Sequence, residues 1–396
     1  MFKKKFGRHQ SSGSRARVNK FAPKKRFNAK AFNDVSKFIN KALPVAEAEP
    51  YVAINSFANL IIDERLKKNI ITAGYTKLTP IQDQSIPYVL TGRDLVGIAN
   101  TGTGKTAAFI IPLLNKVILD KTQKVLIVAP TRELALQINQ ELIKFANSLS
   151  IYSVCTVGGV PIFRQINDLR RPHNFVIGTP GRLKDLIERG CLKLAGFATV
   201  VLDEADRMLD MGFINDMRFL MNAMPKTRHT LFFSATLSHD IKNIISEFLH
   251  QPINVSVKTG DTARGVDQDV VYVKNAPKFD LLHNLLIKPE FNKVLIFGRT
   301  KFGVEKLSKL LTDKGLRAES IHGNKNHMQR QRALSQFKEN RSQILVATDV
   351  AARGLDIPNV SHVINYELPA TYEDYIHRIG RTGRAGKGGA ALTFID

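Results

Sequence analysis

Several features are scarce or missing in this chain of 396 residues. Tryptophan is absent, and there are only two cysteines, Cys155 and Cys191. Two cysteines provide neither a disulfide framework nor a metal-binding spacing, so the sequence predicts a reduced, intracellular protein. No apolar run approaches the roughly 18 residues that a membrane-spanning helix needs, and no apolar stretch follows the early lysines as a secretory signal requires. We therefore expect a cytoplasmic protein with no membrane segment.

Acidic residues are also scarce. The chain has 35 Asp and Glu against 58 Lys and Arg, which gives a formal net charge of +23. Such an excess indicates a polyanionic partner, nucleic acid before membrane. The charge is concentrated in residues 1–41, which contain thirteen Lys or Arg and one acidic residue, Asp34. We interpret residues 1–50 as a basic, disordered extension with one short helix at Phe32–Leu43. An organelle transit peptide is the alternative.

From Phe57 onward, apolar runs rich in β-formers alternate with helical stretches. The expected strands are Leu95–Ala99, Val125–Ala129, Tyr152–Val157, Phe175–Ile177, Thr199–Leu202, Thr230–Phe233, Val294–Phe297, Ile344–Ala347, His362–Asn365 and Ala390–Ile395. Continuous apolar strands separated by helices predict parallel sheets with helices on both faces. The sequence thus predicts an α/β protein with a first domain over 51–257, a linker over 258–267 and a second domain over 268–396.

Two polar motifs each follow an expected strand of the first domain. One is Ala99–Thr106, with the sequence ANTGTGKT, and the other is Asp203–Asp206, with the sequence DEAD. A glycine-rich turn lets backbone N–H groups approach phosphates, and the helix that follows presents its positive N-terminus. Lys105 can reach the β- and γ-phosphates, while the Thr106 hydroxyl and an acidic residue complete a magnesium shell. Together the motifs predict the site of a P-loop NTPase, although Ala99 stands where the strict pattern has glycine.

A third motif, HRIGRTGR, occupies residues 377–384. Its arginines are spaced by three with glycines between them, so several guanidinium groups can converge. Phosphoryl transfer needs positive charge on the departing phosphoryl group, and a supplied arginine is worth about 10³–10⁵ in rate. Taken alone, this segment is also compatible with a solvated basic patch or with a patch that binds nucleic acid.

With these motifs the chain resembles the DEAD-box ATP-dependent RNA helicases, superfamily-2 ATPases with two RecA-like domains, and it is close to their bacterial type. The sequence GYTKLTPIQ at 74–82 resembles the family's Q motif, with Leu78 in place of the usual proline. PTRELA at 130–135, Gly158-Gly159 and TPGR at 179–182 resemble the RNA-contacting segments, and SAT at 234–236 resembles the coupling motif. Segments 297–300, 322–323, 329–332 and 347–356 resemble the elements of the second domain. The family normally continues with a helix after the final strand, where this chain stops.

The resemblance implies roles for individual residues, with ATP and Mg²⁺ as cofactors. Glu204 positions the attacking water, helped by Lys105 and by the arginine fingers Arg381 and Arg384. Gln82 bonds the adenine edge and Tyr75 stacks on its face, within a nucleotide-binding set of Phe57, Tyr75, Gln82, Thr101, Gly102, Thr103, Gly104, Lys105, Thr106 and Asp356. The magnesium set is Thr106, Asp203 and Glu204, and the coupling set is Asp206, Ser234, Thr236 and His377. The RNA-binding set is Pro130, Thr131, Arg132, Gly159, Thr179, Pro180, Gly181, Arg182, Arg299, Thr300, His322, Gly323, Thr348, Asp349 and Arg353.

The composition of the RNA-binding set predicts how RNA is bound. Backbone N–H groups, hydroxyls and guanidiniums suit phosphates and 2′-hydroxyls, which position a strand without reading its bases. We therefore expect a monomer that binds single strands and short duplexes with little sequence preference and separates duplexes locally when ATP draws its two domains together. Two alternatives are an ATP-gated RNA clamp with little unwinding and a DNA-directed helicase. Ribosomal precursors, messenger RNA and decay intermediates all suit such a binder.

Overall fold

The computed structural model describes residues 38–40, 51–100, 102–257, 265–274, 276–352, 357, 359–383 and 388–395. All of them belong to one unit of contacting residues, 35–396. The predicted sites Thr101, Arg353, Asp356 and Arg384 lie outside the described residues, as do residues 1–37 and 41–50 of the predicted extension.

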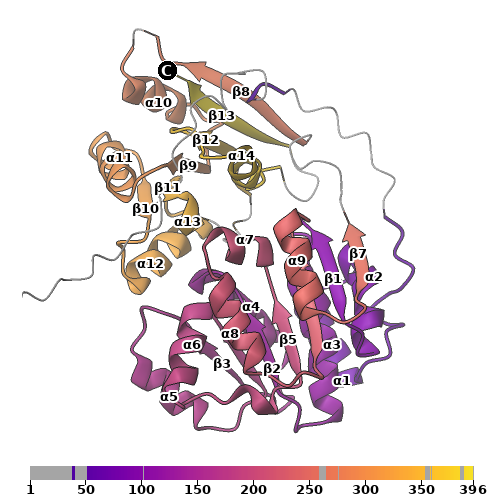
Figure 1. Ribbon diagram of the computed structural model, residues 1–396. Coiled ribbons are helices and arrows are strands. Elements are labelled where there is room, and N and C mark those ends of the chain that lie inside the picture. Colours follow the sequence, from indigo (N-terminus) through magenta and orange to yellow (C-terminus); the bar gives the residue numbers. More distant parts are fainter. Residues whose placement is uncertain are drawn as a thin grey trace, which may run out of the picture. The chain divides into compact units, whose positions relative to one another are not determined.

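The first domain is built on a seven-stranded parallel sheet with the strand order β3-β4-β2-β5-β6-β1-β7 (Figure 1). Its strands are β1 (Leu95–Ala99), β2 (Val125–Val128), β3 (Ser153–Thr156), β4 (Phe175–Gly178), β5 (Thr199–Leu202), β6 (His229–Ser234) and β7 (Ile253–Val257). The five inner strands are buried at every position, whereas the edge strands β3 and β7 alternate. This is the pattern of a parallel sheet covered on both faces.

Helices cover both faces of this sheet. They are α1 (Glu64–Thr72), α2 (Pro80–Leu90), α3 (Lys105–Leu119), α4 (Arg132–Phe145), α5 (Ile162–Leu169), α6 (Pro180–Glu188), α7 (Ala205–Asp210), α8 (Ile214–Asn222) and α9 (His239–Phe248), with a 3₁₀ turn at Leu194–Gly196. One apolar core joins the sheet to α1–α4, and a second joins its other face to α6, α8 and α9. Alternate residues of one strand, such as Leu126 and Ile127 of β2, enter opposite cores because successive side chains point to opposite faces.

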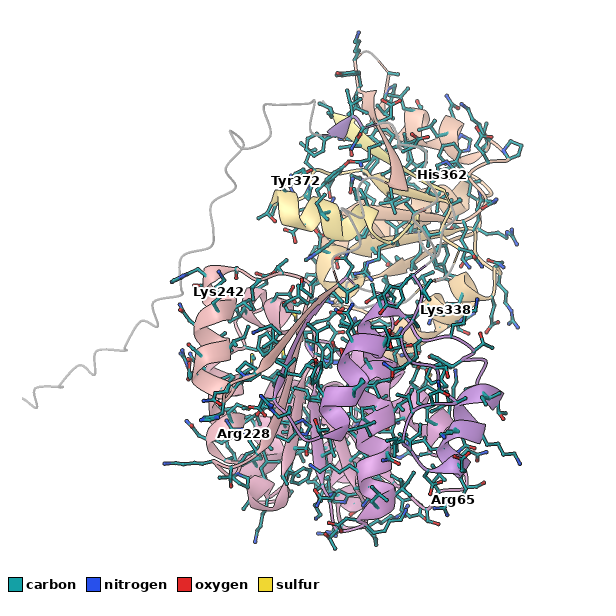
Figure 2. The ribbon with its side chains drawn as sticks, turned by 90° about the vertical axis from the view of Figure 1, so that its right-hand side faces the viewer. Arg65, Arg228, Lys242, Lys338, His362 and Tyr372 are labelled. Carbon is teal, nitrogen blue, oxygen red and sulfur yellow. The ribbon has the colours of Figure 1, made fainter. Side chains whose placement is uncertain are left out.

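The second domain is built on a six-stranded parallel sheet with the order β10-β11-β9-β12-β13-β8. Its strands are β8 (Val266–Tyr272), β9 (Val294–Gly298), β10 (Ala318–Ile321), β11 (Ile344–Thr348), β12 (His362–Asn365) and β13 (Gly389–Ile395). Its helices are α10 (Lys278–Leu286), α11 (Lys301–Asp313), α12 (His327–Lys338), α13 (Asp349–Ala352) and α14 (Tyr372–Ile379). Figure 2 shows the side chains of both domains, among them Lys338 at the end of α12 and Tyr372 at the start of α14.

The α/β class and the two parallel sheets are confirmed, but the sequence analysis did not predict three of the strands. These are β7, β8 and β10, which lie at or beside a sheet edge and carry polar residues on the exposed side. Because β8 begins at Val266, the linker predicted over 258–267 is too long at its end. The helix predicted over Phe32–Leu43 is wrong where it can be checked, since Asn40 pairs antiparallel with Gln268 of β8. In the described part of the chain, no helix is long and apolar enough to cross a membrane.

Candidate active site and nucleic-acid interface

The sheet order brings the motifs of the first domain together. β5, β6 and β1 are consecutive neighbours, and the paired residues Ile98 and Ser234 stand at the ends of β1 and β6. The carboxyl ends of parallel strands lie at one edge of a sheet, which is where ligands bind in open α/β folds. The glycine-rich loop after β1, the acidic motif after β5 and the SAT segment after β6 therefore meet at this edge.

The glycine-rich loop wraps closely around its own lysine. Gly102 and Gly104 have φ angles of 85° and 93°, which only glycine adopts easily. Gly104 is the N-cap of α3, and a Cβ placed on it would come within 2.4 Å of the Gln82 side chain. The buried Lys105 ammonium donates to the Ala99 carbonyl at 2.9 Å, and the Thr103 hydroxyl donates to a loop carbonyl at 2.8 Å. The loop thus holds the Lys105 ammonium at the start of α3.

The buried side chain of Gln82 connects the Q-motif segment to this loop. Its Oε1 accepts from the Thr79 N–H at 3.0 Å, and its Nε2 donates to the Gly104 carbonyl at 3.1 Å. One amide hydrogen and one lone pair are left after these two bonds. A bond from Gln82 to adenine, as predicted, would use that remaining donor and acceptor.

Asp203 and Glu204, which follow β5, are both buried, and their pKa values are shifted in opposite directions. Burial raises the pKa of Asp203 to about 7, an effect that Glu204 increases and Lys105 opposes. Burial also acts to raise the pKa of Glu204, but the charges of Arg207, Lys105 and Arg381 outweigh it and hold that pKa below its usual value. The Arg207 guanidinium donates to Glu204 at 2.7 Å. Glu204 is therefore ionised at neutral pH.

The glycine-rich loop and the two acidic residues line a cavity of about 360 Å³, which is within the size range of small-molecule sites. Tyr75, Gly102, Gly104, Lys105, Thr106, Asp203 and Glu204 all contribute to its walls. The Phe57 ring is buried in the core, where it meets the edge of Tyr75 with ring centroids 6.4 Å apart. The sequence analysis missed a polar wall from α4, formed by Gln137, Gln140, Glu141 and Lys144. Their spacing of three and four residues was the available signal, since it puts them on one face of a helix.

Three of the four predicted coupling residues, Asp206, Ser234 and Thr236, contact one another. The Asp206 carboxylate accepts from the N–H groups of Ala235 and Thr236 at 3.0 and 3.1 Å, and from the Thr236 hydroxyl at 3.3 Å. The Ser234 hydroxyl donates to the Thr236 carbonyl at 2.8 Å. The acidic motif is thereby joined to the segment that follows β6.

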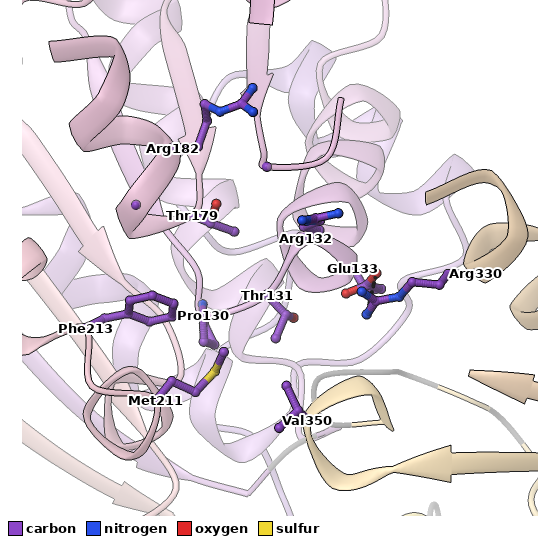
Figure 3. Close-up of a pocket in the computed structure, with 12 residues that line it drawn as sticks. Pro130, Thr131, Arg132, Glu133, Thr179, Arg182, Met211, Phe213, Arg330 and Val350 are labelled. Carbon is purple, nitrogen blue, oxygen red and sulfur yellow. Dashed lines mark ion pairs between the residues drawn. The ribbon is translucent and has the colours of Figure 1, made fainter. Parts of the chain in front are cut away.

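Six of the eight predicted RNA-binding residues of the first domain, all except Gly159 and Pro180, line a second cavity of about 440 Å³ (Figure 3). Its walls include Pro130, Thr131, Arg132, Gly158, Thr179, Gly181 and Arg182. The Thr131 and Thr179 side chains stand at the N-caps of α4 and α6, where backbone N–H groups point outward. Figure 3 also shows Glu133 beside Arg330 of α12, with 2.9 Å between the paired atoms.

Packing explains why residue 159 is a glycine. Gly159 has a φ of 74°, and a Cβ at this position would come within 1.9 Å of the Arg132 guanidinium. Any other residue would displace the guanidinium from the cavity wall. Arg182 is held from the same loop, because its Nη1 donates to the Val160 carbonyl at 3.2 Å.

In the second domain, several predicted RNA-binding residues are engaged internally. The imidazole of His322 is buried and bonds Glu305 at 2.9 Å, so the prediction that this side chain contacts RNA is not supported by its position. Asp349 accepts two bonds from Arg378, at 2.6 and 2.7 Å. Arg378 is 2% exposed and also donates to Asn365 and to a carbonyl. The sequence analysis gave no role to Arg378, which fixes α14 to the start of α13, directly after β11.

Four other predicted residues of the second domain lie at the carboxyl edge of its sheet. Arg299 and Thr300 follow β9, and the Thr300 hydroxyl caps α11 by accepting from the Gly303 N–H at 3.0 Å. Thr348 ends β11, and Gly323 follows His322 on an exposed turn. Arg381 lies just after α14 and is 5% exposed, with Nε donating to the His377 carbonyl at 3.3 Å.

Two family models match the chain. The model described as DEAD/DEAH box helicase matches residues 79–244, and the model of the helicase conserved C-terminal domain matches residues 277–386. Among curated proteins, an ATP-dependent RNA helicase, CshA of Listeria monocytogenes, is 45% identical over 345 residues, which is 87% of this chain. The chain spans only 66% of that relative's length.

Solved structures agree with both models. Dbp5 of S. cerevisiae bound to RNA and ADP BeF3 is 32% identical, with a TM-score of 0.77, covering 86% of this chain and 89% of that one. Mss116 bound to single-stranded RNA and UDP-BeF is 33% identical, with a TM-score of 0.78, covering 86% of this chain and 75% of that one. From the two domains, the gathered motifs and these relatives, the chain belongs to the DEAD-box helicase family and is similar to its bacterial type.

Proposed function

We propose that this protein is an ATP-dependent RNA helicase whose ATP hydrolysis is stimulated by RNA. One observation carries the proposal: Lys105, Asp203 and Glu204 line a single cavity at the ends of β1 and β5. The nearby Asp206 bonds the segment after β6. A movement of the acidic motif when the nucleotide binds or is hydrolysed would therefore also move that segment.

In the proposed hydrolysis, Glu204 orients the attacking water and accepts its proton. Its lowered pKa keeps it ionised at neutral pH, and its bond to Arg207 fixes the direction of the carboxylate. Lys105 and Arg381 supply positive charge where negative charge develops on the departing phosphoryl group. Gln82 and Tyr75 are proposed to hold the adenine, which favours ATP as the substrate.

The residues of the cavity also fit Mg²⁺. Asp203 is a buried carboxylate whose pKa burial raises despite the opposing charge of Lys105, and both Asp203 and Thr106 line the same cavity. Mg²⁺ is usually held by one or two carboxylates plus substrate phosphates, and Asp203 and Thr106 would supply the protein's share of these ligands. When bound, Mg²⁺ would neutralise phosphate charge.

RNA is proposed to bind along the cavity lined by Arg132, Thr179 and Arg182, through its phosphates and 2′-hydroxyls. Dbp5 and Mss116 are bound to RNA in their solved structures, which supports the same ligand here. ATP and RNA would each favour approach of the two domains, so each raises the affinity for the other by the same factor. Bending of one RNA strand would then separate a few base pairs locally.

A strand-displacement assay tests this proposal. We expect a short RNA duplex to be separated with ATP at a rate that falls steeply with duplex length and needs no single-stranded end. The Glu204→Gln variant should fail to hydrolyse ATP and therefore fail to separate duplexes in repeated cycles. Processive separation of long duplexes from one end would contradict local unwinding.

An ATP-gated RNA clamp is a second candidate, because the same cavities serve it. Long-lived RNA complexes and slow phosphate release, with no strand displacement, would favour the clamp. We further propose a cytoplasmic location, which fits the free thiols of Cys155 and Cys191, and a monomeric state, which size-exclusion chromatography would test. Ribosomal and decay complexes are the partners to test first.

A further inference from the structure

Residues 38–40 lie before the first domain in sequence but contact the second. The Asn40 N–H donates to the Gln268 carbonyl at 3.0 Å, and the Gln268 N–H donates to the Asn40 carbonyl at 2.8 Å. Gln268 belongs to β8, the edge strand of the second sheet. Figure 1 shows this short indigo segment beside β8. The segment thus adds one antiparallel pair to an otherwise parallel sheet, in the manner of a strand added to an edge.

Phe38 anchors this pairing. Its side chain is 1% exposed and meets the edge of Tyr375 of α14, with ring centroids 4.9 Å apart. The Tyr375 hydroxyl donates to the Gln268 side chain at 2.9 Å, and its ring stacks on Tyr372 at 5.8 Å. By contrast, Ile39 between the two anchoring residues is 46% exposed. An aromatic ring buried between β8 and α14 is a specific contact, because it removes a large apolar surface from water.

The chain is fixed again eleven residues later, on the first domain. The carboxylate of Asp83, on α2, accepts from the Tyr51 hydroxyl at 2.6 Å and from the Ile54 N–H at 2.8 Å. It also accepts from the backbone and side-chain N–H groups of Asn55, at 2.9 and 2.7 Å. Asp83 is 3% exposed. Four bonds to one buried carboxylate make this a second firm attachment.

We propose that these two attachments form a second tether between the domains, in addition to the linker at 258–264. From Asn40 to Tyr51 the chain can extend about 3.3–3.6 Å per residue, which limits its span to about 40 Å. The two tethers are attached close to each other on both domains. On the first domain, α2 packs against β7, the strand that the linker follows. On the second domain, Asn40 pairs with Gln268 of β8, three residues after Gly265, where the linker ends. The shorter linker already limits how far the domains can separate, so the second attachment chiefly limits how far they can turn relative to each other.

Limited trypsin digestion of the full chain tests the attachment to β8. Lys37 and Lys41 flank the attached residues, and Lys30 provides an internal reference site. Because a paired strand must detach before it is cut, we expect cleavage after Lys37 and Lys41 to be at least about tenfold slower than after Lys30. Phe38→Ala should remove this protection, while the matched variant Ile39→Ala should keep it. Equal cleavage at all three sites in the natural chain would overturn the attachment.

Single-molecule energy transfer tests the tether itself. Cys155 and Cys191 are replaced by serine, and dyes are attached to cysteines introduced at the exposed Lys242 of α9 and Lys309 of α11. Without nucleotide, Phe38→Ala and Asp83→Asn should each add a population at longer distances, and Ile39→Ala should not. Identical distributions in all four proteins, with circular dichroism showing that each is folded, would overturn the tether. Neither readout depends on ATP hydrolysis, so the result is independent of the proposed function.

Discussion

The two domains share one architecture but place their charged residues differently. In the first domain, Lys105, Asp203 and Glu204 line a cavity at the carboxyl edge of the sheet. In the second domain, the buried Arg378 is held by the carboxylate of Asp349. Buried charges that face a cavity cost stability and are suited to a ligand, whereas buried charges bound to each other fix loops. We infer that the first domain performs the chemistry and that the second provides a rigid support for Arg381.

The largest expected effect concerns the chemistry of the first domain. Glu204→Gln keeps the size of the side chain but removes the base, so ATP turnover should fall by about 10²–10⁴-fold. ATP binding, measured with a fluorescent analogue, should be retained. Loss of both ATP turnover and ATP binding would mean that Glu204 maintains the structure of the cavity and does not act in the reaction.

The next effect concerns the rigidity of the second domain. Asp349→Asn leaves the buried Arg378 without a carboxylate, and we expect a loss of about 3 kcal/mol in unfolding free energy. Denaturant unfolding of the full chain measures it. Glu339→Gln is the matched control, because its partner Arg341 has a side chain that is 74% exposed and such pairs contribute little. Equal effects of both variants would contradict the view that Arg378 holds α14.

Asp83→Asn should have a smaller and pH-dependent effect. Burial alone would raise the pKa of Asp83, but the hydrogen bonds from Tyr51, Asn55 and the Ile54 N–H outweigh it and hold that pKa below its usual value. A lowered pKa in the folded state stabilises the protein above the usual carboxyl pKa, and this gain is lost as pH falls through the folded value.

The variant should therefore cost about 1–3 kcal/mol at pH 7. Its difference from the natural chain should shrink below about pH 4. Unfolding measured across this range checks the sign, and a difference that grows toward low pH would contradict it.

The smallest expected effect concerns coupling. Thr236→Val removes the hydroxyl bond to Asp206 and leaves the two backbone bonds in place. Loss of one such bond is worth about 1 kcal/mol, so strand displacement should fall by about 2–10-fold while RNA-stimulated ATP turnover changes little. A parallel fall in both rates would assign Thr236 to the chemical step.

Sequence patterns predicted the parts of the molecule that depend on short segments. The glycine-rich loop and the acidic motif were recognisable because each follows a continuous apolar strand, and the parallel sheet then brings them to one edge. The inner strands were found for the same reason. β7 and β8 were missed because an edge strand has one polar side and lacks the continuous apolar run.

Long-range contacts were not predictable from such patterns. Nothing in the sequence near Asp83 indicates that Tyr51 and Asn55 bond to it, because these partners lie 28 to 32 positions away. Phe38 lies in a strongly basic segment, and only the structure shows it against Tyr375. The internal bonds of His322 and Asp349 likewise depend on the packing of the second domain.

The most direct test of the central claim is the steady-state ATPase activity of the full chain without nucleic acid, with RNA, and with DNA of matching sequence. The account predicts strong stimulation by RNA, weak or no stimulation by DNA, and loss of the stimulated rate in Glu204→Gln. Equal stimulation of the ATPase rate by DNA, or an ATPase rate that RNA does not change, would contradict the account.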